Sequence, residues 1–288
     1  LERKWGVYFC MGGTGKIVKE LENLMLRQGI TISKETDVER ISIEDGKAKD
    51  VTLTNGRKIP ADLVICNADP PTVYSEMLPS KYSRDSLLKP KKFTHYSMGL
   101  YVLFFGSRKK FSDVAHHTIW MSERYKELLH DIFEKKILTD DFSLYLHRPT
   151  ATDDTFAPEG CDSFYVLCPV PNLQGNIQWN LEGPKLKDRI VEALDKTIMP
   201  GLKENIEAEF WMTPEDFKND YRSKYGAGFS VAPIFSQSAW FRYHNKDKKI
   251  PNLYFSAAGS HPGAGIPGVL CSAKVIEKLI MKDFKVSH

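Results

Sequence analysis

The segment from residue 37 to residue 66 alternates apolar and polar positions with the two-residue period of half-buried strands. The pairs Asp45-Gly46 and Asn55-Gly56 interrupt this alternation, and both pairs favour tight hairpin turns. We therefore predict a three-stranded antiparallel meander. Its last strand ends in "DLVICNA", which is apolar throughout, and this predicts that the chain returns there into a buried parallel sheet.

A second apolar run, "LYFSAAG", ends at a loop in which five of the seven residues 262–268 are glycine or proline. After the loop, Val269, Ala273, Ile276 and Ile280 recur at helical spacing. The pattern predicts a buried strand, a loop whose backbone can approach a ligand closely, and a helix whose first amides suit a phosphate or a delocalised anion. An ordinary strand–turn–helix corner is the alternative interpretation.

Residues 72 to about 240 combine aromatic-rich strands with amphipathic helices. The strand candidates are residues 98–106, 116–121, 141–149 and 162–171, and the helix candidates are residues 123–136 and 183–198. This order predicts an inserted domain built on an antiparallel sheet with helices. Its many Phe, Tyr and Trp side chains either fill the core or line a site for a long apolar ligand.

The stretch "MGGTGKIVKELENL" predicts a glycine turn followed by a helix with Ile17, Leu21 and Leu24 on one face. Although "GGTG" is similar to part of a phosphate-binding loop, it lacks the GxxxxGK[ST] spacing. We therefore interpret it as a helix-entry turn.

The amino-acid composition of the chain excludes some classes of function. The 288 residues carry a formal charge of +3, which is too small an excess for a dedicated nucleic-acid-binding protein. A basic stretch at residues 81–92 is either a solvated linker or a patch for anionic lipid headgroups. No apolar run approaches the ~18 residues that span a bilayer, and no signal peptide is recognisable.

The spacing of the cysteines and histidines indicates whether the chain forms disulfides or binds a metal ion. Five scattered cysteines without a CxxC pattern indicate reduced thiols in a cytosolic protein. The eight histidines include the pair His116–His117, but they show no HExxH or comparable spacing. The sequence therefore predicts no metal site.

Longer segments resemble, in the same order, the bacterial and fungal type phytoene desaturases, which are flavoproteins related in fold to the amine oxidases. The resemblance covers nearly the whole chain, and the segments that carry it include "ERKWGVYFCMGGTGKIV", "ICNAD", "AHHTIW", "RYKELLHDIF", "APEGCDSFYVLCPVP", "FSVAPIFSQSAWFRYHN" and "NLYFSAAGSHPGAGIPGV".

The resemblance implies a mixed α/β (α+β) fold in which a partial FAD-binding, Rossmann-like domain carries an inserted substrate domain. Residues 1–70 would form part of the FAD-binding domain, residues 71–240 the inserted substrate and membrane-docking domain, and residues 241–288 the C-terminal βα unit of the FAD-binding domain. In the family, an N-terminal GxGxxG unit holds the FAD pyrophosphate. Because these 288 residues lack that unit, we expect them to be the C-terminal part of a longer enzyme and to be inactive alone.

The cofactor contacts that the resemblance implies lie at both ends of the chain. The amide of Val38 would pair with the adenine edge of FAD. Gly259 and Ser260 stand where many related flavoproteins carry a Gly-Asp pair against the ribityl chain or the pyrophosphate. The residues that would pass under the isoalloxazine ring are Gly265, Ile266, Pro267, Gly268 and Val269.

The activity that the resemblance implies is FAD-dependent desaturation of phytoene, or of a related C30 or C40 carotene precursor, to neurosporene- or lycopene-type polyenes. A hydride passes to the flavin, a neighbouring carbon loses a proton, and a quinone or oxygen accepts the electrons. His147, His244 and His261 are candidates to assist the proton loss.

The enzyme would lie in the cytoplasm, peripherally associated with the inner face of the membrane through residues 81–92 or an amphipathic helix around Leu128 and Ile132. Two alternatives stay open. One is a related flavoprotein oxidoreductase or isomerase that acts on another isoprenoid, and the other is a non-catalytic, truncated isoprenoid-binding module.

Overall fold

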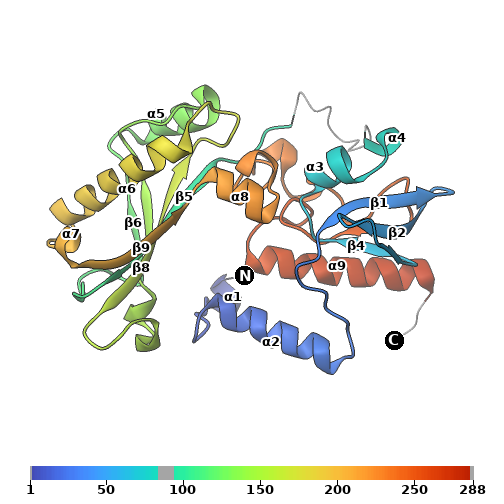
Figure 1. The fold of residues 1–288 in the computed structure, drawn as a ribbon, viewed down its shortest axis with the longest axis horizontal. Helices are drawn as coiled ribbons and strands as arrows, with labels where there is room; N and C mark the ends of the chain where they lie inside the picture. The colour runs from blue at the N-terminus through green and yellow to red at the C-terminus, as the bar shows by residue number, and fades with distance from the viewer. Residues whose placement is uncertain (1, 84–93, 286–288) are drawn as a thin grey trace.

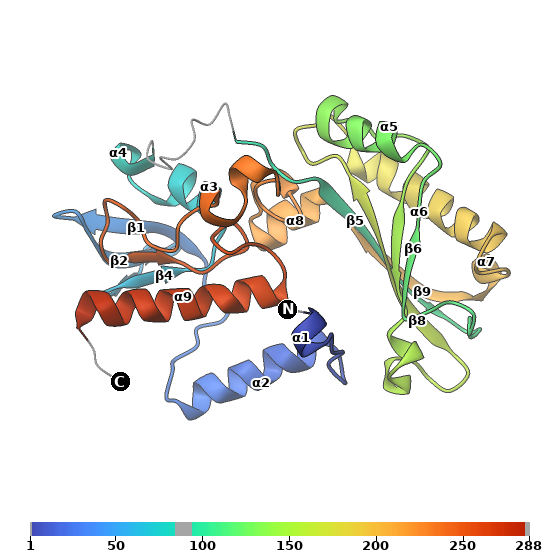
Figure 2. The same cartoon turned by 180° about the vertical axis from the view of Figure 1, so that it is seen from behind.

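The computed structural model describes residues 2–83 and 94–285. They form two lobes, one with the C-terminal helix α9 (Ile266–Phe284) and one with a five-stranded sheet (Figures 1 and 2). This mixture of helix and sheet confirms the predicted mixed α/β class.

The predicted meander is present in the first lobe. It consists of β1 (Val38–Glu44), β2 (Lys47–Leu53) and β3 (Lys58–Pro60), paired antiparallel in that order. Gly46 and Gly56 adopt φ angles of 75° and 83° in the two turns, a conformation that glycine reaches without steric cost.

The chain then leaves the meander for β4 (Val64–Cys66), which pairs in parallel with β10 (Leu253–Phe255). The predicted parallel return is therefore confirmed, although β4 lies in a separate two-stranded sheet. Val64 and Cys66 are buried, whereas Ile65 is 49% exposed, so burial of this strand is one-sided.

The helical segment after β4 belongs to the same core. It consists of α3 (Pro70–Thr72) and the π-turn η1 (Val73–Met77), and it is followed by α4 (Ser80–Ser83). Val73 and Tyr74 are buried against Phe255 of β10. The packing of the first lobe therefore continues beyond residue 70, where the sequence analysis draws its domain boundary.

The second lobe contains the predicted antiparallel sheet, with strand order β6-β7-β8-β5-β9. Its strands are β5 (Gly99–Ser107), β6 (His117–Trp120), β7 (Leu144–His147), β8 (Asp162–Val170) and β9 (Ile206–Met212). The sequence analysis anticipates the first four of these strands but not β9, whose side chains are mostly exposed.

Helix α6 (Trp179–Lys196) covers one face of this sheet with Leu186, Ile190 and Leu194, each fully buried. Beside it lie α5 (Tyr125–His130), which continues into the π-turn η3 (Asp131–Lys135), and the short α7 (Leu202–Asn205). Figures 1 and 2 show these helices on the side of the sheet away from α9. The other face of the sheet therefore looks toward the first lobe.

The remaining helices are the N-terminal α1 (Glu2–Trp5) and α2 (Thr14–Arg27) and several short turns. Gly13 caps α2, which confirms the predicted helix-entry turn. The other short elements are α8 (Pro214–Tyr221), η4 (Pro149–Ala151), η5 (Asp154–Phe156), η6 (Lys224–Gly226), η7 (Phe235–Gln237) and η8 (Ala239–Phe241).

Two statements about membranes follow. Within residues 2–83 and 94–285, no helix is both long and apolar enough to cross a bilayer. Residues 84–92 of the basic stretch that the sequence analysis considers for lipid headgroups lie outside the described residues.

Candidate functional site

A cavity of about 860 Å³ separates the open face of the five-stranded sheet from the start of α9. Three segments enclose it: the sheet itself, the N-terminal residues around Phe9, and the first helical residues Ile266 and Pro267. Most side chains that line it are aromatic or aliphatic, which is typical of a site for an apolar ligand.

The sheet wall of the cavity is a single cross-strand row. Phe210 on β9 is the direct partner of Phe104 on β5, which is the partner of Tyr165 on β8. Tyr165 is in turn the partner of His147 on β7, and His147 is the partner of His117 on β6. Four strand spacings make this row about 19 Å long. The row is therefore an aromatic strip with a histidine end.

The rings of this row are in contact. Phe104 and Phe210 stack with centroids 4.5 Å apart and planes 9° apart, and Tyr165 lies 5.8 Å from Phe104 and 5.0 Å from His147. Strand β8 explains the arrangement, because its residues alternate strictly between buried and half-buried. Phe164 is buried in the same hydrophobic core as Leu186 and Ile190 of α6 and only borders the cavity, whereas the half-buried Ser163 and Tyr165 line it.

The N-terminal segment closes the cavity on one side. The amide of Gly12 donates to the Asp153 carboxylate at 2.8 Å, which holds this segment against the loop after β7. Gly13 has a φ of 79°, and a Cβ there would stand 2.8 Å from the ring of Phe156. The glycines of "GGTG" therefore allow the backbone to approach the second lobe closely.

The start of α9 forms the opposite wall. Gly265 has a φ of 97°, and among the described residues no atom lies within 4 Å of the place where a Cβ would stand. A Cβ on Gly268 would approach the carbonyl oxygen of Gly263 to 2.6 Å. In the described part of the chain, no side chain caps the first amides of α9. These amides are thus available to an anion or to an electron-rich ring edge.

The other predicted cofactor residues lie away from this cavity wall. Ser260 is fully buried, and its hydroxyl donates to the Ala257 carbonyl and accepts from the Ala257 amide, both at 2.9 Å. A Cβ on Gly259 would stand 2.6 Å from Pro70, so the close packing of the protein itself requires glycine there. Val38 opens β1 opposite Leu53. Their predicted contacts with FAD stay predictions.

Arg242, which the sequence analysis does not single out, fixes the loop before α9. Its buried guanidinium donates to the carbonyls of Ala258, at 2.8 and 2.9 Å, and of Phe229, at 2.9 Å. A buried arginine that binds carbonyl oxygens leaves no periodic pattern in the sequence.

The three candidate catalytic histidines are in different places. His147 lines the cavity. Nδ1 of His261 donates to the Ala239 carbonyl at 3.0 Å, and His244 packs edge-to-face on Trp240 with centroids 5.0 Å apart. Of the three, His147 alone is among the residues that line this cavity.

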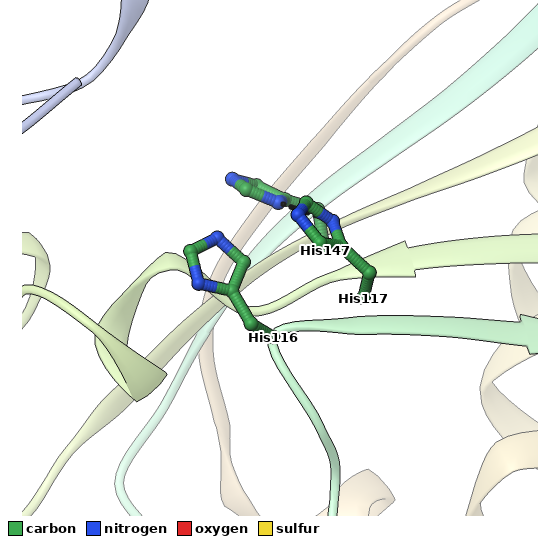
Figure 3. Close-up of side chains that lie close together, drawn as sticks. All are labelled: His116, His117 and His147. Atoms are coloured by element: carbon green, nitrogen blue, oxygen red, sulfur yellow. Dashed lines mark hydrogen bonds between the residues drawn. The ribbon is translucent and has the colours of Figure 1, made fainter. Parts of the chain in front are cut away.

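Two further histidines join His147 at the edge of the cavity. Figure 3 shows that the rings of His116, His117 and His147 converge on one space. One ring nitrogen from each residue lies within 4.8 Å of the others. Burial, together with the charges of the other two histidines, lowers the pKa of His147 to about 4, and burial lowers the pKa of His116. These two rings are therefore uncharged at neutral pH.

A buried ion pair holds the backbone at this cluster. Arg148 directly follows His147, and its guanidinium lies 3.0 Å from the Asp162 carboxylate. The backbone amide of Arg148 donates to the carbonyl of His116 at 2.9 Å. Asp162 also accepts from Thr150 and from the amide of Phe111. The segments that carry the histidines are thus fixed to one carboxylate.

The sequence of the chain is similar to the sequences of known proteins. Residues 2–275 match the family model described as flavin containing amine oxidoreductase. A lycopene-forming phytoene desaturase of Pseudescherichia vulneris is 44% identical over 290 residues, covering 99% of this chain and 58% of the relative. A neurosporene-forming phytoene desaturase of Rhodobacter capsulatus is 40% identical, covering 97% of this chain and 55% of the relative. The chain thus spans somewhat more than half the length of these relatives.

Among solved structures, an oxidoreductase from Methanosarcina mazei superposes with a TM-score of 0.62 at 18% identity, covering 93% of this chain and 55% of the neighbour. At this identity the likeness concerns the fold. It agrees with the mixed helix-and-sheet fold.

Proposed function

Because the chain belongs to the family of flavin containing amine oxidoreductases, we propose that it serves FAD-dependent desaturation in carotenoid biosynthesis. The proposed substrate is phytoene, or a related C30 or C40 carotene precursor, and the products are polyenes of the neurosporene or lycopene type. The names of the relatives from Pseudescherichia vulneris and Rhodobacter capsulatus support this choice.

The observation that carries the proposal is the aromatic row that faces the start of α9 across the cavity. A hydrocarbon offers no polar group, so the protein must bind it through shape and apolar burial. The stacked rings of Phe210 and Phe104, with the tilted ring of Tyr165 beside them, supply a continuous apolar surface for an extended chain.

The residues at the start of α9 fit a flavin. The open space beside Gly265 accepts a flat ring, and the uncapped amides can stabilise negative charge on its pyrimidine edge. When bound, the flavin supplies the hydride acceptor of the desaturation. Ile266 and Pro267 face the cavity beside this position, so they exclude water from the reacting carbons.

His147 is the proposed proton acceptor because of its position. It continues the aromatic row directly beside Tyr165 and lines the cavity. A hydrocarbon lying along the row would end beside the imidazole, which can take a proton from the carbon next to the one that loses the hydride. Arg148 and Asp162 keep this ring in place. A quinone or oxygen is the proposed final electron acceptor.

We further propose peripheral attachment to the inner face of the membrane, since the substrate dissolves in lipid. Phe235 and Trp240 are 87% and 70% exposed on neighbouring turns, which suits insertion among headgroups. In the predicted docking helix, Leu128 is buried, whereas Tyr125 is 45% exposed. Flotation with anionic liposomes should weaken in Phe235→Ser/Trp240→Ser and persist in Tyr125→Ser. The reverse pattern would assign docking to the helix.

A chimera tests the proposed activity. In it, these 288 residues replace the matching segment of the Pseudescherichia vulneris enzyme, and the unaltered relative is the positive control. With FAD and phytoene-loaded liposomes, the chimera should form coloured polyenes. If it binds FAD and leaves phytoene colourless while the relative converts it, the proposed function is wrong.

A further inference from the structure

We infer that His116, His117 and His147 form a binding site for one zinc ion at the histidine end of the cavity. The sequence analysis predicts no metal site because it considers spacing along the chain. The fold brings His147 next to a histidine pair that is 30 residues earlier, through the antiparallel pairing of β6 with β7.

The distances fit a small cation. Nδ1 of His117 and Nδ1 of His147 are 3.5 Å apart, and one nitrogen from each of the three rings lies within 4.8 Å of the others. Zinc binds imidazole nitrogen at about 2.0–2.1 Å, so tetrahedral ligands stand ~3.3 Å apart. His117 and His147 already have nearly this separation, and the other separations, which are within 4.8 Å, must shorten for His116 to become the third ligand.

The hydrogen bonds of His116 prepare it as a ligand. Its Nδ1 is bonded to the hydroxyl of Thr152, and its Nε2 is buried without a hydrogen-bond partner among the described residues. Figure 3 shows one nitrogen of this ring turned toward His117 and His147. Metal-binding histidines commonly hold the second nitrogen in such a bond, which fixes the tautomer and orients the ring. Coordination would also give the buried Nε2 a partner.

The surroundings also suit a metal with neutral ligands. Nδ1 of His117 is 2.7 Å from the hydroxyl of Tyr145, a hydrogen bond that this nitrogen would exchange for the metal on coordination. Phe9 packs edge-to-face on His116, with ring centroids 4.7 Å apart, and shields that side.

Three imidazoles leave a fourth position on the ion. Because His147 lines the cavity, this position is accessible to water or to a small anion from the cavity. Imidazole nitrogens suit zinc, and three histidines with an open fourth position are a known type of zinc site. Zinc on His147 would occupy the lone pair that proton transfer needs, so the zinc-bound state and the proposed proton-accepting state of this ring exclude each other, and zinc binding is tested without turnover.

The test uses the 288-residue chain after treatment with a chelator. Calorimetric titration with Zn²⁺ should give one site per chain, and Co²⁺ should produce the visible absorption of a tetrahedral complex. X-ray absorption at the zinc edge should report three imidazole ligands at about 2.0 Å. This last measurement needs no variant, so it tests the ligands even if a substitution disturbs folding.

Variants identify the ligands. His116→Ala and His147→Ala should each weaken Zn²⁺ binding by more than 10-fold, and Thr152→Val by about 10-fold through the lost outer contact. His244→Ala removes a half-buried histidine outside the cluster and should leave binding unchanged. Cys10→Ser, at the cavity wall, should also have no effect.

The inference is overturned if the wild-type chain shows no saturable Zn²⁺ binding. It is also overturned if sulfur appears among the zinc ligands, or if His116→Ala and His147→Ala bind as tightly as the wild-type chain.

Discussion

His147 on β7 stands directly opposite His117 on β6, with their Nδ1 atoms 3.5 Å apart. The same cross-strand row continues through Tyr165 to Phe104 and Phe210. One row of the sheet therefore presents an apolar strip and, at its end, a group of imidazoles. The imidazole group therefore stands at one end of an apolar surface that suits a hydrocarbon.

The two faces of the sheet should respond differently to loss of an aromatic ring. Phe164 is 3% exposed under α6, so Phe164→Ala should lower the free energy of unfolding by about 3–5 kcal/mol. Phe104 faces the cavity, so Phe104→Ala should lower it by about 1 kcal/mol or less. In the chimera, Phe104→Ala should instead raise the KM for phytoene about tenfold. Urea unfolding and initial rates measure the two effects, and equal destabilisation by both variants would contradict the assignment of faces.

The carboxylate of Asp162 should be essential for stability. It is fully buried and binds Arg148, Thr150 and the amide of Phe111. Asp162→Ala leaves the buried Arg148 charge without its carboxylate, with only backbone carbonyls such as that of Val114 as acceptors, and should cost about 3–5 kcal/mol in urea unfolding. Asp154 pairs with a lysine but is 85% exposed, so Asp154→Ala should cost less than about 1 kcal/mol. Similar costs for both variants would show that the ion pair does not hold the loop.

Asp69 should make stability depend on pH. Burial raises the pKa of this carboxyl, outweighing its hydrogen bond from Ser230. The unfolded chain then releases the proton at lower pH than the folded chain, so this group's contribution to stability falls as pH rises through the folded pKa. Asp69→Asn removes the effect. The free energy of unfolding of Asp69→Asn relative to wild type should therefore increase from pH 4 to pH 8, and a constant or decreasing difference would contradict it.

A side chain at Gly265 should weaken FAD binding because it fills the space proposed for the flavin ring, in addition to straining the backbone. Gly29 has a similar positive φ, 74° against 97°, and in both cases no described atom lies within 4 Å of the Cβ position. Both substitutions place a valine at a positive φ, but Gly265 also has a ψ of 147°, a conformation reached almost only by glycine, so FAD binding is compared per folded protein. In the chimera, we expect Gly265→Val to weaken FAD binding by at least about 10-fold and Gly29→Val to leave it unchanged. Stoichiometric FAD in purified Gly265→Val would mean that the ring lies elsewhere.

Some of this structure could be predicted from local patterns. Alternation and turn pairs predict the meander, and the apolar runs of β4 and β10 predict a parallel pair that the structure contains. Strand β9 is absent from the predicted elements, although its first five residues, "IEAEF", alternate apolar and acidic side chains. Its place in the sheet depends on pairing with β5, which local sequence does not encode.

The histidine group at the cavity could likewise be predicted only in part from the sequence. His147 could be named from the sequence, but its grouping with His116 and His117 depends on the register between two strands and on the loop held by Asp162. Likewise, Arg242 acts through carbonyl oxygens that any residue could supply. Long-range register and backbone contacts leave no signature in hydrophobic periodicity.

Reduction of the flavin by the substrate tests the central claim most directly. The FAD-loaded chimera is mixed without oxygen with phytoene in liposomes, and the flavin and polyene absorption bands are followed together. The account predicts that the flavin band bleaches as polyene absorption rises, and that His147→Ala slows both at least about 100-fold. A flavin band that stays oxidised with phytoene present, while the Pseudescherichia vulneris enzyme bleaches under the same conditions, would contradict it.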